Sequence, residues 1–157
     1  MCWLCDHPGA TIDDALDNVR AVIDRNGWAV QCVENPSAPW AYTIGLHAFG
    51  LPELLVTGLE PQAAGSLLNH VADVTMGGIP FTPGTRTTAD SGMLVEVVEV
   101  DHPDAHMNVA MAIEGPFVTA RQLVWADERG RMPWERGYRR GRRSQPVWGV
   151  RSAPGPG

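Results

Sequence analysis

A change of hydrophobic period early in the chain constrains the fold more than any other feature. Over residues 12–25 apolar side chains return at helical spacing, and Thr11 with Asp14 supplies the pattern that caps a helix start. Asn26-Gly27 then supplies the signal that ends a helix. In residues 28–34 successive side chains divide between two faces, as they do in a strand. The chain therefore opens with a predicted amphipathic helix followed by a strand.

The remaining predicted elements alternate between strands and helices, with turns rich in Pro, Gly, Asn and Ser between them. Adjacent early strands favour antiparallel pairing with helices gathered on one face, and the later alternation leaves room for a mixed sheet. The sequence predicts an α+β fold: one layer of about five strands, mostly antiparallel or mixed, with two to three helices packed on it. The expected strands are residues 28–34, 40–46, 53–59, 93–100 and 117–126, the expected helices are 12–25, 61–76 and 103–113, and residues 79–92 form a loop.

The length of 157 residues fits a single domain, expected over residues 1–150. Within it, residues 1–10 form a Cys-containing lead-in and residues 127–150 an extension rich in Arg and Trp, while residues 151–157 are expected to be a disordered tail. No apolar run reaches the roughly 18–20 residues of a membrane helix, and the N-terminus lacks the features of a signal peptide. We therefore expect a cytoplasmic protein without a membrane partner.

Charge is distributed unevenly along the chain. Residues 1–126 contain fifteen acidic residues and four Arg, whereas residues 127–157 contain three acidic residues and eight Arg. The acidic body disfavours nucleic acid as a partner, although Arg interleaved with aromatic rings can bind single strands. The Arg/Trp-rich C-terminal region is instead a predicted contact for a protein partner.

A Cys-x-x-Cys motif at the N-terminus suggests a metal site. Cys2 and Cys5 can bind one ion together, and His102 and His106 have the spacing that places two rings on one helix face. Together they make a Cys2His2 set, with His7 as a substitute ligand and zinc as the first metal expected, before iron or copper. The alternative is that the cysteines sit on a loose terminus and the histidines are solvated. A redox role is disfavoured because no strand precedes Cys2.

A second possible site lies near the strand ends around residue 50. His47 follows one predicted strand and Glu53 opens the next, so the two side chains are candidates for an acid–base pair. They could equally be loop surface. The chain has no Walker, Gly-x-Gly-x-x-Gly or Gly-x-Ser-x-Gly motif, so no nucleotide cofactor is indicated, and whether the protein is an enzyme stays open.

Several segments together resemble a known bacterial family, the domains of unknown function numbered forty-two sixty-two. The Cys-x-x-Cys-Asp-His-Pro opening and the His-Pro-Asp-x-His stretch resemble an actinobacterial subgroup of that family. The resemblance implies a small cytoplasmic α+β domain and implies that the C-terminal extension belongs to the fold. It carries over no activity or catalytic residue. The matching segments include Ala41-Tyr42-Thr43-Ile44-Gly45-Leu46, Leu51-Pro52-Glu53-Leu54, Thr57-Gly58-Leu59, Gln122-Leu123-Val124-Trp125-Ala126-Asp127, Pro133-Trp134 and Gln145-Pro146.

The signature segments also have a physical interpretation. Gly45 and Gly58 lie in or beside neighbouring strands, where a missing side chain permits close approach of a ligand or of another backbone. Tyr42, Thr43 and Asn69 could then line one cleft with the Glu53 carboxyl; the alternative is tight packing of sheet on helix. Three functions are carried forward: a zinc-type metal-binding domain as the first hypothesis, a protein-interaction module without chemistry, and a small-molecule enzyme.

Overall fold

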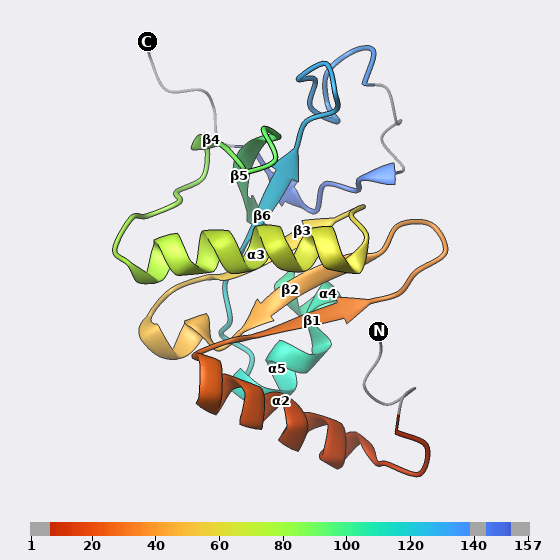
Figure 1. Ribbon diagram of the computed structural model, residues 1–157, viewed down its shortest axis with the longest axis vertical. Helices are drawn as coiled ribbons and strands as arrows, with labels where there is room; N and C mark the ends of the chain where they lie inside the picture. The colour runs from red at the N-terminus through yellow and green to blue at the C-terminus, as the bar shows by residue number, and fades with distance from the viewer. Residues whose placement is uncertain (1–6, 139–143, 152–157) are drawn as a thin grey trace.

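The computed structural model describes residues 7–138 and 144–151, and it shows an α+β domain built on one sheet (Figure 1). Within these residues the sheet has seven strands, ordered β1-β2-β3-β6-β5-β4, with β7 beside β5. The strands are β1 (Ala29–Val33), β2 (Trp40–Ile44), β3 (Glu53–Thr57), β4 (Arg86–Thr88), β5 (Leu94–Val100), β6 (Ala120–Trp125) and β7 (Gly149–Val150). The helices are α2 (Ile12–Asn26), α3 (Pro61–Met76), α4 (Pro103–His106), α5 (Asn108–Glu114) and the short 3-10 helix η1 (Leu46–Phe49).

The sheet is larger than predicted, and it is mixed. Strands β1, β2 and β3 pair antiparallel, as expected for consecutive strands, whereas β3 and β6 run parallel at the centre. The prediction of about five strands was too low because β4 has three residues and β7 has two, too few to show an alternating pattern. Strand β4 lies within the segment predicted to be a loop.

Helix α2 confirms the strongest prediction of local structure. The Thr11 hydroxyl accepts a hydrogen bond from the Asp14 amide at 3.2 Å, and the Asp14 carboxylate accepts one from the Thr11 amide at 2.9 Å. This reciprocal pair satisfies two amides that have no partner inside the helix. At the other end Gly27 adopts φ of 92°, the left-handed conformation that ends a helix.

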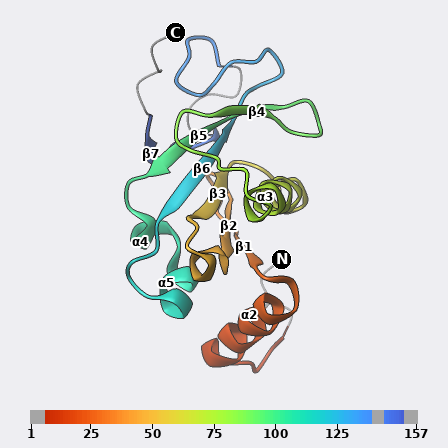
Figure 2. The same ribbon diagram turned by 90° about the vertical axis from the view of Figure 1, so that its left-hand side faces the viewer.

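Helices cover both faces of the sheet, which corrects the expectation that they gather on one face. Helix α3 lies over one face, and α4 and α5 lie over the opposite face (Figure 2). The reason is that the central strands are buried on both sides, with Leu54 and Val56 in the core below α3 and Leu55 in the core below α5. The predicted single helix over residues 103–113 is divided at Met107 into α4 and α5.

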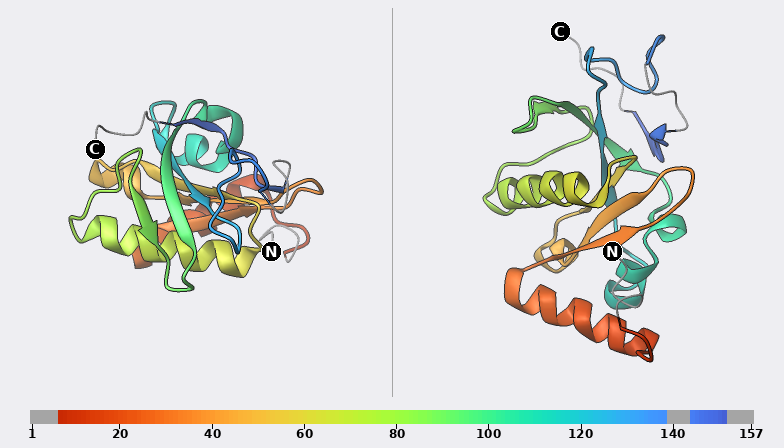
Figure 3. Two further views of the ribbon diagram at one scale, coloured as in Figure 1. Left: turned by 90° about the horizontal axis from the view of Figure 1, so that it is seen from above. Right: turned by 45° about the vertical axis from the view of Figure 1, so that its right-hand side comes forward.

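Residues 145–148 of the C-terminal extension pack against the sheet. Gln122 in β6 donates a hydrogen bond to the Pro146 carbonyl and accepts one from the Trp148 amide, both at 2.8 Å. The side chain of Gln145 is 1 % exposed and bonds both the amide and the carbonyl of Trp125. Helix α2 and the loop that follows β6 lie at opposite ends of the molecule (Figure 3). No helix in the described part of the chain is long and apolar enough to span a membrane.

Candidate functional site

Two of the signature segments, residues 41–46 and 51–54, meet around the carboxylate of Glu53 at the start of β3. This side chain is fully buried, and its Oε1 accepts hydrogen bonds from the Thr43 hydroxyl at 2.8 Å and the Leu46 amide at 3.2 Å. Its Oε2 accepts from the amides of Gly45 and His47 at 3.0 and 3.1 Å. Four donors thus surround one buried carboxylate, an arrangement that offsets the cost of removing it from water.

Gly45 is required where this turn begins. Its φ of 128° belongs to the region that favours glycine, and a Cβ there would collide with the carbonyl oxygen of Gly27. A Cβ on Gly58, at the other end of β3, would collide with the carbonyl oxygen of Ser144. At both glycines the close neighbour is therefore another stretch of backbone.

A second carboxyl group, that of Glu114, lies beside Glu53. Burial raises the pKa of Glu114 to about 8, helped by a hydrogen bond with Glu53 and by its charge, while a hydrogen bond from the Gly45 amide acts in the opposite direction. At neutral pH Glu114 is therefore protonated, and a carboxylic acid lies next to a carboxylate.

His47 reaches Glu53 through its backbone rather than its side chain. The His47 amide donates to Glu53, and no hydrogen bond between the imidazole and this carboxylate is found in the described residues. The imidazole is half-buried. The acid–base role predicted for this pair stays a prediction, and the structure places a different acid, Glu114, next to Glu53.

The three residues predicted to line a cleft separate. Thr43 bonds Glu53, but the Tyr42 hydroxyl accepts from the Val109 amide at 3.1 Å, at the start of α5. Burial raises the pKa of Tyr42 to about 12, so its hydroxyl keeps its proton. Asn69 lies on α3 and accepts a hydrogen bond from the Trp28 indole at 3.0 Å. The structure therefore brings Thr43 to Glu53 and places Tyr42 and Asn69 elsewhere.

The predicted metal ligands are only partly within the described residues. Cys2 and Cys5 lie outside them, and no group of three or more His, Cys, Asp or Glu that could hold an ion occurs in residues 7–138 and 144–151. His7 and His102 are exposed. The zinc site stays a prediction.

His106 makes its contacts with two tryptophans. Its ring stacks on Trp148 at 3.7 Å between centroids, and the Trp40 indole donates to its carbonyl oxygen at 2.9 Å. Burial lowers the pKa of His106, which favours the neutral ring. In this structure His106 helps to hold the C-terminal extension against α4.

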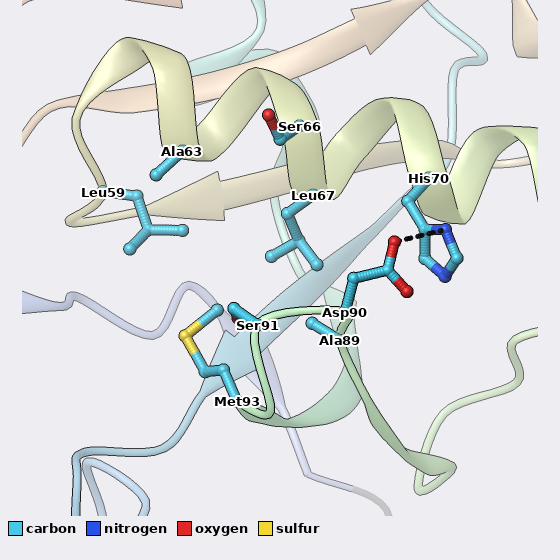
Figure 4. A pocket seen from close by; sticks show the side chains of 9 residues that line it. All are labelled: Leu59, Ala63, Ser66, Leu67, His70, Ala89, Asp90, Ser91 and Met93. Carbon is cyan, nitrogen blue, oxygen red and sulfur yellow. Dashed lines mark ion pairs between the residues drawn. The ribbon is translucent and has the colours of Figure 1, made fainter.

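An open, largely apolar cleft surrounds Leu59, between the end of β3 and the start of α3. We call it the Leu59 cleft; it consists of three hollows of about 230, 200 and 430 Å³ that all include Leu59. Figure 4 shows the first hollow, where Leu59, Leu67 and Met93 face the space between α3 and the loop before β5. The second is lined mainly by Cys32, Pro39, Trp40 and Ala64, and the third mainly by Met93, Leu94, Trp125 and Ala126.

Polar side chains at the edge of the first hollow do not form a catalytic triad. The His70 ring lies 3.8 Å from the Asp90 carboxylate, and both side chains are largely exposed. Ser66 lies one turn earlier on α3, but its hydroxyl points away from the His70 ring (Figure 4). A triad needs the hydroxyl within hydrogen-bond reach of the imidazole, so this cleft is better suited to binding than to nucleophilic catalysis.

The described Arg and Trp side chains of the C-terminal region largely make contacts within the domain. Arg151 bonds the buried Glu96 carboxylate at 2.9 Å and lies 4.0 Å from the centre of the Trp134 ring. Burial would raise the pKa of Glu96, but hydrogen bonds and charge from Arg151 and Arg86 outweigh it and lower the pKa. Four further arginines of this region, Arg139, Arg140, Arg142 and Arg143, lie outside the described residues.

Fold and signature together define a small α+β domain with a buried carboxylate at the start of β3. The chain belongs to the family described as Domain of unknown function (DUF4262), whose model matches residues 22–139. No curated protein and no solved structure matches the chain. The family match includes both carboxyls and every residue that lines the Leu59 cleft, and it excludes the N-terminal cysteines.

Sequence reasoning missed two parts of this site. Glu114 precedes Gly115-Pro116 at the end of a predicted helix, where an acidic residue ordinarily faces solvent. No local pattern reveals that it meets Glu53, a residue sixty-one positions earlier. The Leu59 cleft was missed because its walls come from four separate segments, and each apolar residue in them was already explained by its own strand or helix.

Proposed function

We propose that this domain is a protein-interaction module, and that the Leu59 cleft receives an apolar side chain from a partner segment that also carries basic residues. The observation that carries the proposal is that three hollows meet at Leu59. An apolar anchor in a concave surface is the usual source of affinity in such contacts.

The lining favours an apolar anchor over a polar one. Leu59 and Met93 are only half-buried, although both also touch the core cluster that includes Leu67 and Trp125. Their positions are therefore set by the core, while part of each side chain remains open to a ligand. A cleft held rigid in this way loses little conformational freedom on binding.

The rim of the cleft favours a positively charged partner. Each hollow has an exposed acidic residue among those that line it: Asp90 in the first, Glu34 in the second and Glu128 in the third. None of the described residues lining the three hollows is Arg. Opposite charges around an apolar centre speed association and exclude acidic partners. This supports a partner segment with Arg or Lys beside its apolar anchor.

Two short peptides of equal length test the proposal, each with a central Leu-Met pair and flanked either by Arg or by Glu. Titrated into the nitrogen-15-labelled full chain, the Arg-flanked peptide should shift the amide signals of Leu59, Ala63 and Met93. The Glu-flanked peptide should leave them in place. Leu59→Gln should weaken binding about tenfold, the effect of removing one buried anchor.

Ile79→Gln is the matched control, because Ile79 is 60 % exposed and does not line the three hollows. It should bind the Arg-flanked peptide as the unaltered chain does. Equal binding of both peptides, shifts confined to another surface, or no binding by either peptide would overturn the proposal.

A further inference from the structure

The carboxyls of Glu53 and Glu114 meet where the end of α5 lies near the η1 turn, away from the Leu59 cleft. We infer that protonated Glu114 donates a hydrogen bond to Glu53, that this bond fastens α5 to η1, and that loss of the proton in mildly alkaline solution frees residues 114–117. We call this pair of carboxyls, Glu53 and Glu114, the catch; it is a pH-sensitive contact that does not depend on the proposed binding function.

Glu53 is the fixed half of the catch. Three of its four hydrogen-bond donors are backbone amides of Gly45, Leu46 and His47, which belong to the turn that opens η1. Because these donors belong to one turn of backbone, they fix the position of the Glu53 carboxylate. A rise in pH is therefore expected to change the charge and position of Glu114.

Glu114 is the half that changes charge. It is the last residue of α5, and its Oε2 atom is buried without a hydrogen-bond partner among the described residues. While protonated, Glu114 can donate to Glu53. Once ionised, it places a second negative charge beside the first in a buried setting, which favours outward movement of the side chain.

Among the surrounding ionisable groups, Glu53 is the one whose charge raises the pKa of Glu114. Helix α2 packs on this side of the sheet through Val19 and Ile23, and its charged residues there are exposed. The ionisable groups on the elements that pack against α5 are His47 on η1, Tyr42 on β2, Asp13, Asp14, Asp17, Arg20, Asp24 and Arg25 on α2, and His102, Asp104 and His106 on and beside α4.

The direction of the pH effect follows from the raised pKa. Glu114 binds its proton more tightly in the folded domain, where its pKa is about 8, than in the unfolded chain, where it titrates near 4.5. The stabilisation is complete below the unfolded value and is lost as the pH rises through about 8. Gly115 has φ of 93° and Phe117 is 85 % exposed, so little packing holds the segment once the catch opens.

Carbon-13 NMR of the labelled glutamate carboxyls tests the proposal on the full chain. The Glu114 signal should titrate near pH 8. Hydrogen exchange corrected for base catalysis should become about tenfold faster in residues 108–119 between about pH 6 and about pH 10, as this end opens locally. Glu114→Gln keeps a donor toward Glu53 but cannot ionise, so it should abolish the acceleration.

Glu60→Gln is the matched control, since Glu60 is exposed and makes no side-chain hydrogen bond at the start of α3. It should keep the pH-dependent exchange. A Glu114 signal that titrates near its ordinary value overturns the inference, as does an acceleration that survives Glu114→Gln. If this variant fails to fold, the carboxyl titration of the unaltered chain decides alone.

Discussion

The two ends of strand β3 lead to opposite kinds of environment. At its start, Glu53 is fully buried and receives four hydrogen bonds, so the polar group is enclosed and satisfied. Beyond its end, Leu59 is half-buried and borders three open hollows, so an apolar group is left partly exposed. Both ends belong to the family signature. A recurring motif can thus hold the backbone in place at one position and leave a surface for a ligand a few residues later.

Substitution at the start of β3 should give the largest effect. Glu53→Gln keeps the shape but turns an amide group toward backbone amides that need an acceptor. Buried donors left without partners make the expected loss about 3–5 kcal/mol of unfolding free energy. Urea unfolding measures it, with Glu60→Gln expected to stay within about 0.5 kcal/mol of the unaltered chain. A loss below about 1 kcal/mol would show that the carboxylate is not needed there.

Substitution of Gln145, which bonds the end of β6, should give the second largest loss of stability. Gln145→Leu removes the hydrogen bonds to the amide and carbonyl of Trp125 and to the Tyr138 hydroxyl. The expected cost is about 2–3 kcal/mol, because a similar volume is kept while buried polar groups lose their partners. Thermal unfolding checks it; an unchanged melting temperature would mean that water replaces the lost contacts.

At the open end of β3, a substitution should affect binding more than stability. Leu59→Gln removes an apolar group that is only half-buried, so the expected cost is about 1 kcal/mol of unfolding free energy. The same variant should lose about tenfold in peptide affinity. If stability falls as far as it does in Glu53→Gln, the contrast between the two ends of the strand is wrong.

The contact between His70 and Asp90 at the edge of the first hollow should contribute less to the unfolding free energy than the contacts above. Asp90→Asn removes the charge that faces His70 at 3.8 Å. Because both side chains are largely exposed, the unfolding free energy should change by less than about 0.5 kcal/mol. Affinity for the Arg-flanked peptide should nevertheless fall measurably, whereas a larger stability change would make Asp90 part of the scaffold.

The N-terminal cysteines, Cys2 and Cys5, lie outside the described residues and outside the family match, and they provide a separate test of the zinc hypothesis. The predicted zinc site requires that protein purified without a His tag contain about one zinc per chain. Cys2→Ser/Cys5→Ser should lose that metal, as measured by elemental analysis. A metal content far below one in the unaltered chain would end the zinc hypothesis.

Local structure was predictable wherever one segment carries its own signal. The capping residues and periodicity of α2, and the start of α3 at Pro61 with its end at Met76, were predicted within a residue. Strands β4 and β7 were missed, because so few residues carry no period. The sequence did not predict that helices cover both faces of the sheet. Leu54 and Leu55 are buried on opposite faces, but in the sequence they form one apolar run that does not separate the two faces.

The candidate site was predictable only in part. Thr43 and Glu53 were singled out and do lie together, but the backbone amides that hold the carboxylate leave no trace in residue types. Glu114 needed knowledge of how α5 lies relative to β3. Contacts of this kind depend on chain packing rather than on spacing, so a single sequence does not reveal them.

Gln145 has a consequence for where this domain can be cut. Its side-chain amide presents to Trp125 the same donor and acceptor that a neighbouring peptide group would, so one side chain substitutes for an additional strand. A fragment that stops at residue 139, where the family match ends, would lack this substitute and would leave the end of β6 uncovered. Such a fragment should be prone to pair with itself, and truncations intended to stay monomeric need to extend through Trp148.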